Sequence, residues 1–324
     1  MRQGNDDQTA GHGHGECEPG DNPGAAGRGK SKDPTPATIG QPCARRVPFG
    51  HKSSQPWMEP RLDPTGITRF AHNFVALPPW QVVLWATLYF AALYFVTGAL
   101  TWWLTRSLLP RVGFGRVLDQ RPLRPGQLSR EIAESCGSIL LFGVGVLVPW
   151  WLLRSGWAGL AYEASGPRIA VELFSLFLWN ELHFYLCHRL LHSRPLRRFH
   201  ADHHRSLTPT PFATYAFHPV EALLLGSVPI LPMLVHDFSP IALFCLPLMS
   251  IVLNNLGHAN YEFSQHAPAR GPLAASRRHH LHHAVYHGNY GFLLDVFDRL
   301  AGTTIAAGAA DHLAAPSHVK DSRE

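Results

Sequence analysis

The chain has 324 residues and a formal net charge of +5, and its hydrophobic residues are gathered in a few long segments rather than spread evenly. The five cysteines are scattered without a Cys-x2-Cys pair, which argues against a disulfide framework and a zinc knuckle. No motif of interleaved aromatic and basic residues accompanies the positive charge. We therefore expect no nucleic-acid partner and assign the arginines to anionic lipid headgroups.

The composition divides the chain into three regions. Residues 1–60 are rich in glycine, proline, serine and charge, with almost no aliphatic periodicity. Such a composition cannot bury enough apolar surface to offset the entropy of ordering, so we expect a disordered tail. We expect residues 70–303 to form one membrane-embedded domain and residues 304–324 to form a flexible C-terminal tail.

Four apolar segments follow the tail in chain order. Residues 80–104 carry no charge, have tryptophans near both ends, and exceed the roughly 20 residues that a helix needs to cross a bilayer. Residues 136–153 are a second segment with tryptophans near its end, and residues 169–187 are a third. Residues 220–256 contain four prolines and a His-Asp pair near the middle, which predicts a helical hairpin that turns at 236–240.

The third segment is polar for a helix that faces lipid, because it carries Glu172, Asn180, Glu181 and His183. Polar groups inside a span usually face protein or a functional cavity. His183 precedes His188 by five residues, which is about 140° around a helix. We therefore expect His183 to pack beside the histidines that follow it rather than to bind metal with them.

The positions of the arginines predict the orientation of the segments. The loop 106–130 carries six arginines, which predicts that it is cytoplasmic. Counting spans from this loop places residues 188–204 and the return of the hairpin on the same side. The sequence thus predicts an all-α protein, a polytopic membrane helical bundle of about four to five spans with a cytosolic, helical, histidine-rich di-metal domain.

Eight histidines form three tight groups, each beside an apolar segment. Residues three or four apart on a helix point in similar directions, and neutral imidazole is the commonest protein ligand for mid-series transition metals. One such pair alone is more often a solvated or packed pair, but the repeated pattern favours metal binding. Eight ligands exceed what one ion with an open position can use, so two metals are expected. The groups are His188-x3-His192, His200-x2-His203-His204 and His279-x2-His282-His283.

Two further histidines stand at the feet of the predicted hairpin. His258, in GHAN at its return, should reach the same face as the three groups, and we expect it to be a ninth ligand. His218, in FHPVE, precedes a proline that suits the first turn of a helix. A helix cap and a group at the lipid interface therefore stay open for His218 beside metal binding.

Taken together, these motifs resemble the fatty acid hydroxylase and sterol desaturase superfamily. Between about 170 and 303 the chain reads ELHFYLCHRLLH, HADHH, FHPVE, GHAN, HHLHH, NYG and FDRLAGT. Members of the superfamily commonly show D-x4-W-x-H-R-x2-H, two copies of H-x2-H-H, N-Y-G and W-D-R-x-F-G-T. The chain has Glu181, Leu186, Phe297 and Ala301 where the family usually has Asp, Trp, Trp and Phe, and none of these departures removes a histidine.

The resemblance implies an integral-membrane, non-haem di-iron enzyme that uses O2 and two electrons on unactivated C–H bonds of lipids. Its cofactor would be two iron ions, which zinc can replace in isolated protein, and O2 would be the co-substrate. We expect no catalytic residue beyond the metal ligands, and we expect Asn289, Tyr290, Asp298 and Arg299 to brace the third histidine group. The implied ligands are His188, His192, His200, His203, His204, His279, His282 and His283, with His258 added.

The expected function is hydroxylation of a lipid or sterol-like substrate, and desaturation is the alternative because both begin with the same hydrogen abstraction. We expect a multi-pass membrane protein with its histidines on the cytoplasmic side. A separate electron donor of the ferredoxin or cytochrome b5 type is expected, since no fused haem or flavin reductase domain is visible.

A metal transporter is a remote alternative, because transport sites favour the middle of the membrane and these histidines stand at span ends. A lipid-binding protein without catalysis is the other, and the intact ligand set disfavours it.

Overall fold

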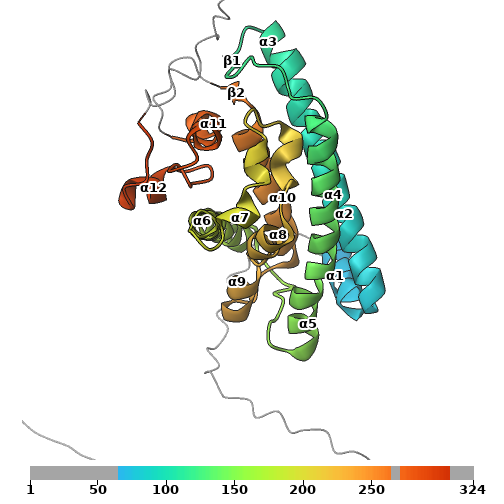
Figure 1. Cartoon of the computed structure of the whole chain (residues 1–324). Coiled ribbons are helices and arrows are strands. Elements are labelled where there is room, and N and C mark those ends of the chain that lie inside the picture. Colours follow the sequence, from blue (N-terminus) through green and yellow to red (C-terminus); the bar gives the residue numbers. More distant parts are fainter. Residues whose placement is uncertain (1–64, 264–270, 307–324) are drawn as a thin grey trace, which may run out of the picture. The chain divides into compact units, whose positions relative to one another are not determined.

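The computed structural model describes residues 65–263 and 271–306, so the expected N-terminal tail and most of the expected C-terminal tail lie outside the described residues. Within these ranges the chain is mostly helical, which confirms the all-α expectation, and two short strands pair antiparallel (Figure 1). The strands are β1 (Arg116–Val117) and β2 (Tyr261–Glu262). The helices are α1 (Thr65–Ala76), α2 (Pro79–Trp103), α3 (Leu109–Arg111), α4 (Gln127–Gly145), α5 (Leu147–Ser155), α6 (Gly166–Leu191), α7 (Arg197–His200), α8 (Pro219–Gly226), α9 (Ile230–Val235), α10 (Pro240–His258), α11 (Ala275–Val285) and α12 (Val296–Leu300).

Three helical stretches of the described chain are long and apolar enough to cross a membrane: Pro79–Arg111, Gln127–Arg154 and Pro240–His258. The first of them runs from α2 through a π-helical turn, Leu104–Leu108, into α3. α6 is a continuous helix of 26 residues, but it is not among the three. The predicted number of four to five spans therefore stays a prediction.

The apolar stretch breaks between α9 and α10, where the prolines and the His-Asp pair indicated a turn. α9 ends at Val235 and α10 begins at Pro240, with the Ser239 hydroxyl accepting a hydrogen bond from the Ala242 N–H at 3.3 Å. The first arm is shorter than expected, because Ser227, Val228 and Pro229 separate α8 from α9. Proline lacks the N–H that would continue a helix, which accounts for the break.

α2 and α4 lie side by side along much of their length (Figure 1). They meet closely at Gly143 of α4, where an added Cβ would lie 3.1 Å from the Cβ of Thr87. Next to this contact Tyr94 of α2 and Ile139 of α4 are buried in an apolar cluster with Tyr215. The hydroxyl of Tyr94 donates to the Phe212 carbonyl at 2.8 Å, so the same cluster holds the segment after the second histidine group.

α10 is the helix that joins the two sides of the fold. It packs against α2 on one side and against α6 and α11 on the other (Figure 1). Its last two turns carry the buried amides of Asn254 and Asn255, which bond to Thr214, and end at the buried His258. The end of α10 thus places His258 where α10 packs against α6 and α11.

The polar residues of α6 face protein, as expected for the third segment. Glu172, Asn180 and Glu181 are all buried. Glu172 accepts from the Arg168 side chain at 2.9 Å and from the Ser239 N–H at 2.8 Å, near the start of α6. Glu181 accepts two backbone N–H groups of the segment that precedes α12, at 3.1 and 2.7 Å. These carboxylates tie α6 to the hairpin turn at one end and to the closing segment further along.

We predict that Gly143→Ala loosens the α2–α4 contact, because the new methyl group must displace Thr87. Overpacking of this kind costs about 1–3 kcal/mol. Gly137→Ala is the matched control, since it lies on the same helix with nothing within 4 Å of the added Cβ. Both variants are heated in detergent, and the temperature at which the protein ceases to be monodisperse is measured. This temperature should be lower for Gly143→Ala than for Gly137→Ala. Equal temperatures for the two variants would contradict the close contact.

Candidate metal centre

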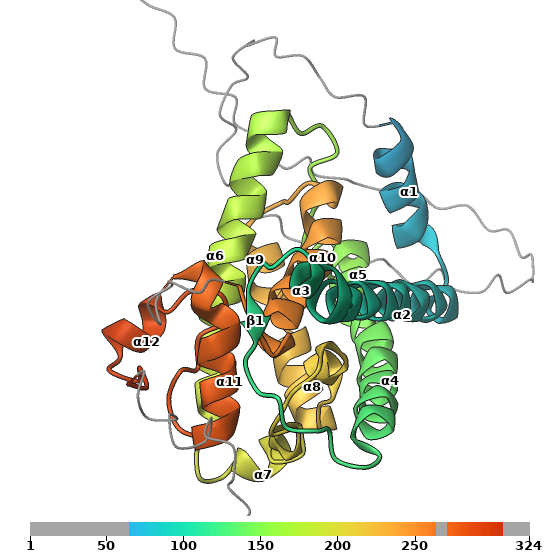
Figure 2. The ribbon, with the colours of Figure 1, turned by 90° about the horizontal axis from the view of Figure 1, so that it is seen from above.

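The nine histidines that the sequence singled out come together in two buried groups, where the ends of α6 and α10, the α7 segment and α11 meet (Figure 2). In each group the candidate ligand atoms all lie within 4.8 Å of one another. The first group draws on all three sequence clusters, and the second group draws on the second and third clusters and on His258. The first group is His188, His192, His200, His204 and His282, and the second is His203, His258, His279 and His283.

Helical spacing explains how neighbours in the sequence are divided. His279 and His283 are four residues apart on α11, and both belong to the second group. His282 lies on another side of the same helix and belongs to the first group. In the shorter helical turns after α6, His200 and His204 likewise share the first group, whereas His203 faces the second. Each His-x2-His-His motif therefore supplies ligands to two adjacent sites.

Within each group the Nε2 atoms approach one another closely. His282 Nε2 lies 3.1 Å from the Nε2 atoms of His192 and of His204. In the second group the His258 Nε2 atom lies 3.1 Å from that of His203 and 3.0 Å from that of His279. Two nitrogen ligands about 2.1 Å from one ion and at right angles to each other would stand about 3.0 Å apart. The spacing of the nitrogens is therefore that of ligands to a shared ion.

Backbone carbonyls fix the tautomer of three of the rings. A carbonyl oxygen only accepts hydrogen bonds, so an Nδ1 atom beside it must carry the hydrogen. In the neutral ring the Nε2 atom then carries a lone pair. The contacts are His188 Nδ1 with Tyr290 O at 2.9 Å, His258 Nδ1 with Asn254 O at 2.9 Å, and His282 Nδ1 with Gly288 O at 2.7 Å. All three lone pairs belong to atoms that could bind metal.

Two observations show that these lone pairs suit a cation. The Nε2 atoms of His188 and His200 are buried and have no hydrogen-bond partner among the described residues. His279 Nε2 lies 3.0 Å from the Nε2 atom of His258 and 3.1 Å from that of His283, and a single hydrogen cannot point at both. A metal ion in each group would satisfy these nitrogens, so the residues present fit a metal.

Burial keeps the rings of the second histidine cluster, after α6, and of the third, on α11, neutral. Loss of hydration lowers the pKa of all six of their predicted ligands well below the ordinary value, and the neighbouring imidazoles lower it further. Neutral imidazole is the form that binds metal. The six are His200, His203, His204, His279, His282 and His283.

Three other histidines of the described residues lie outside the two groups. His183 Nε2 contacts the Ser227 hydroxyl at 3.2 Å and belongs to neither group. His218 is the N-cap of α8, where its Nδ1 accepts from the Val220 N–H at 3.2 Å, so the cap left open by the sequence is the observed role. His280, which lies between predicted ligands on α11, also belongs to neither group and has its Nε2 3.7 Å from Asp119.

The closing motif braces the centre mainly through side chains that bind backbone groups. Asp298 accepts the N–H groups of Tyr290 at 2.9 Å and Gly291 at 2.7 Å, which holds the Tyr290 carbonyl against His188. Asn289 donates to the Arg278 carbonyl of α11 at 3.2 Å. Arg299 contributes less, since its side chain is exposed and its contact with Asp295 is long, at 3.6 Å.

Two carboxylates at the centre were missed by sequence reasoning. Glu221 accepts from His200 Nδ1 at 2.8 Å, but its place three residues after a helix cap made it resemble an ordinary first-turn glutamate. Glu131 of α4 accepts from the hydroxyls of Ser206 and Thr210, which follow the second histidine cluster in the sequence. Nothing in the local sequence of Glu131 indicates this long-range contact.

Comparison with known proteins agrees with this geometry. The family model described as Fatty acid hydroxylase matches residues 173–303, which include all nine histidines. The Delta(7)-sterol 5(6)-desaturase of Eremothecium gossypii is 34% identical over 188 residues, 55% of this chain and 51% of that protein. Residues 173–303 are thus similar to the fatty acid hydroxylase and sterol desaturase superfamily.

Two further relatives extend the similarity into the apolar helices. The Delta(7)-sterol 5(6)-desaturase of Saccharomyces cerevisiae is 28% identical over 71% of this chain and 64% of its own length. Lathosterol oxidase of Mus musculus is 27% identical over 61% of this chain and 68% of its own. The chain thus spans about half to two thirds of these relatives, and no solved structure matches significantly. Together with these relatives, the three long apolar helices indicate an integral membrane protein.

We predict that His282→Ala lowers the metal bound per chain by about half, because it removes a central ligand of the first group. His280→Ala is the matched control on the same helix and should leave the metal content unchanged. Elemental analysis of the purified variants makes the comparison. Equal loss of metal in both variants, or loss in neither, would contradict the assignment.

We predict that the centre is labile to acid. The unfolded chain takes up protons on its histidines near pH 6.5, whereas the folded rings resist protonation because burial lowers their pKa. The unfolded state therefore binds more protons below about pH 6.5, and stability falls as the pH falls. Bound metal and the unfolding temperature should be constant from about pH 8 to 7 and decline below 6.5. Values that hold steady to pH 5 would be inconsistent with neutral, buried ligands.

Proposed function

We propose that the chain is an O2-dependent di-iron oxidoreductase that hydroxylates a C–H bond of a membrane lipid. The observation that carries the proposal is the pair of buried histidine groups, whose Nε2 atoms converge at the ends of apolar helices. All nine histidines are the proposed ligands. Two bound iron ions would supply oxygen activation, using two electrons from outside the chain.

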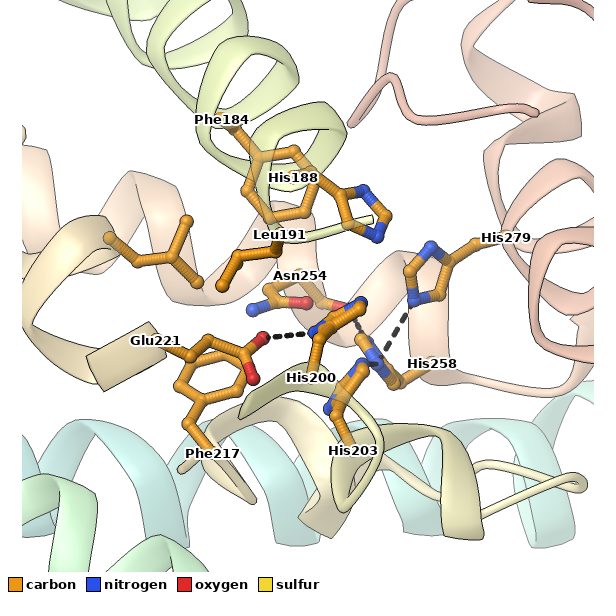
Figure 3. A pocket seen from close by; sticks show the side chains of 11 residues that line it. Phe184, His188, Leu191, His200, His203, Phe217, Glu221, Asn254, His258 and His279 are labelled. Carbon is orange, nitrogen blue, oxygen red and sulfur yellow. Dashed lines mark hydrogen bonds and ion pairs between the residues drawn. The ribbon is translucent and has the colours of Figure 1, made fainter. Parts of the chain in front are cut away.

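A small cavity between the two groups supports this chemistry. It has a volume of about 10 Å³ and is lined on one side by rings from both groups, including His188, His203 and His279 (Figure 3). Phe184, Leu191, Phe217 and Leu225 line it as well. A space of this size holds about one water-sized molecule. The side chains thus restrict water at the rings, and we propose that a lipid chain approaches across this apolar wall.

The names of the relatives direct the choice of substrate. Those proteins are called sterol desaturases and lathosterol oxidases, so sterol-like lipids are the first substrates to test. Hydroxylation converts R–H, O2, two electrons and two protons into R–OH and water. Desaturation is the second candidate, favoured by the same names, and converts two neighbouring C–H bonds with the same reactants into a double bond and two waters.

Charge near the centre supports a separate electron donor. Arg194, Arg197 and Arg198 are exposed on the segment between the first and second histidine clusters. A basic surface beside a redox centre suits an acidic partner. We therefore propose a donor of the ferredoxin or cytochrome b5 type that docks here. The same arginines support placing the centre on the cytoplasmic side.

We predict that cells expressing the chain with a compatible donor convert an added sterol-like or fatty acyl lipid. Mass spectrometry of the extracted lipids should show a gain of one oxygen, or a loss of two hydrogens if desaturation prevails. Cells expressing His282→Ala are the control and should show neither product. Unchanged lipids and no substrate-dependent O2 uptake, with iron-loaded protein and a reduced donor, would contradict the proposed function.

A further inference from the structure

Glu221 is a carboxylate in direct contact with the histidine groups. It lies in the first turn of α8, and its side chain is 1% exposed. Its Oε1 atom accepts from His200 Nδ1 at 2.8 Å, and Figure 3 shows the His200 ring between this carboxylate and the other rings. Of the nine rings, His200 alone has a carboxylate as its Nδ1 partner within the described ranges.

The start of α8 leaves this carboxylate free to face inward. A glutamate at the third position of a helix often bonds back to the backbone of the cap residue. Here His218 is the cap and its own ring accepts the Val220 N–H at 3.2 Å, while Pro219 occupies the first helical position. Glu221 instead contacts His200, which is 21 residues earlier in the chain.

Within the described residues, Glu221 has no lysine or arginine partner. Its Oε2 atom is buried and has no hydrogen-bond partner among the described residues. Leu191, Phe217 and Leu225 line the same small cavity as Glu221. Burying a carboxylate among apolar groups is unfavourable unless a positive charge is near. Metal bound by His200 and its neighbours would supply that charge, which nine neutral imidazoles do not.

We propose that Glu221 is a positioning residue of the metal centre. Its Oε1 atom accepts a hydrogen bond from the Nδ1–H of His200. The Nε2 atom of His200 therefore presents its lone pair to the first group. Its negative charge also strengthens the ring as a ligand and offsets part of the charge of the metal. This inference rests on the proposed function, because it requires that the histidines bind metal.

The experiment compares Glu221→Ala and Glu221→Gln with the wild type. Full-length protein in detergent is stripped of metal and titrated with Co²⁺, whose visible absorption bands report its ligands. Loss of a carboxylate behind a histidine ligand lowers metal affinity by about 10–100-fold. We expect that loss at one of the two sites in Glu221→Ala, with shifted bands. Glu221→Gln should lose less, since an amide oxygen still accepts the Nδ1–H.

Glu172→Gln is the matched control. Glu172 is also buried, at 3% exposure, but it bonds to Arg168 and Ser239 near the other end of α6. This variant should bind Co²⁺ as the wild type does. In a His200→Ala background, adding Glu221→Ala should weaken binding no further, because the partner is already gone.

The outcomes separate this inference from the function on which it rests. A wild type that binds no Co²⁺ at the histidines would contradict the metal centre itself. A wild type that binds two ions, with Glu221→Ala unchanged in affinity and absorption, would contradict only the role of Glu221. Should Glu221→Ala fail to fold, the nearly isosteric Glu221→Gln decides, and wild-type affinity and bands in that variant would overturn the inference.

Discussion

Nine imidazole rings pack closely against one another inside the protein. Nitrogen atoms of neighbouring rings lie about 3 Å apart. Removal from water disfavours the charged form of each ring, and carbonyl groups behind several of them turn the Nε2 lone pair inward. Lone pairs facing one another repel and leave hydrogen-bonding capacity unused. A bound cation removes both penalties, so metal binding and correct packing of this region are coupled.

The rest of the fold holds this arrangement in place. The rings come from segments far apart in the chain, and each segment is held by contacts unrelated to metal. Glu181 of α6 anchors the residues before α12, and Asp298 then fixes the loop whose carbonyls meet His188 and His282. On the opposite side Glu131 holds the residues that follow His204. Buried carboxylates on α4 and α6 thus set the positions of the loops around the rings.

Much of the centre could be predicted from the sequence. The spacing of the histidines on helices predicted that they would share faces, and the end of an apolar segment predicted where His258 would arrive. The division of each His-x2-His-His cluster between the two groups could not be derived, because it depends on how α11 is turned against α6 and α10. The role of Glu221 was also hidden, since the local pattern FHPVE describes only the start of a helix. The third apolar segment, residues 169–187, was predicted as a span despite its polar residues and lies within α6. The structure shows that Glu172, Asn180 and Glu181 are buried against other parts of the protein.

The most direct measurement is anomalous X-ray diffraction from crystals of the iron-loaded protein, recorded at the iron absorption edge. The account predicts two iron peaks in each molecule, one among the five nitrogens of the first group and one among the four of the second. A single peak, or iron located away from these rings, would contradict it.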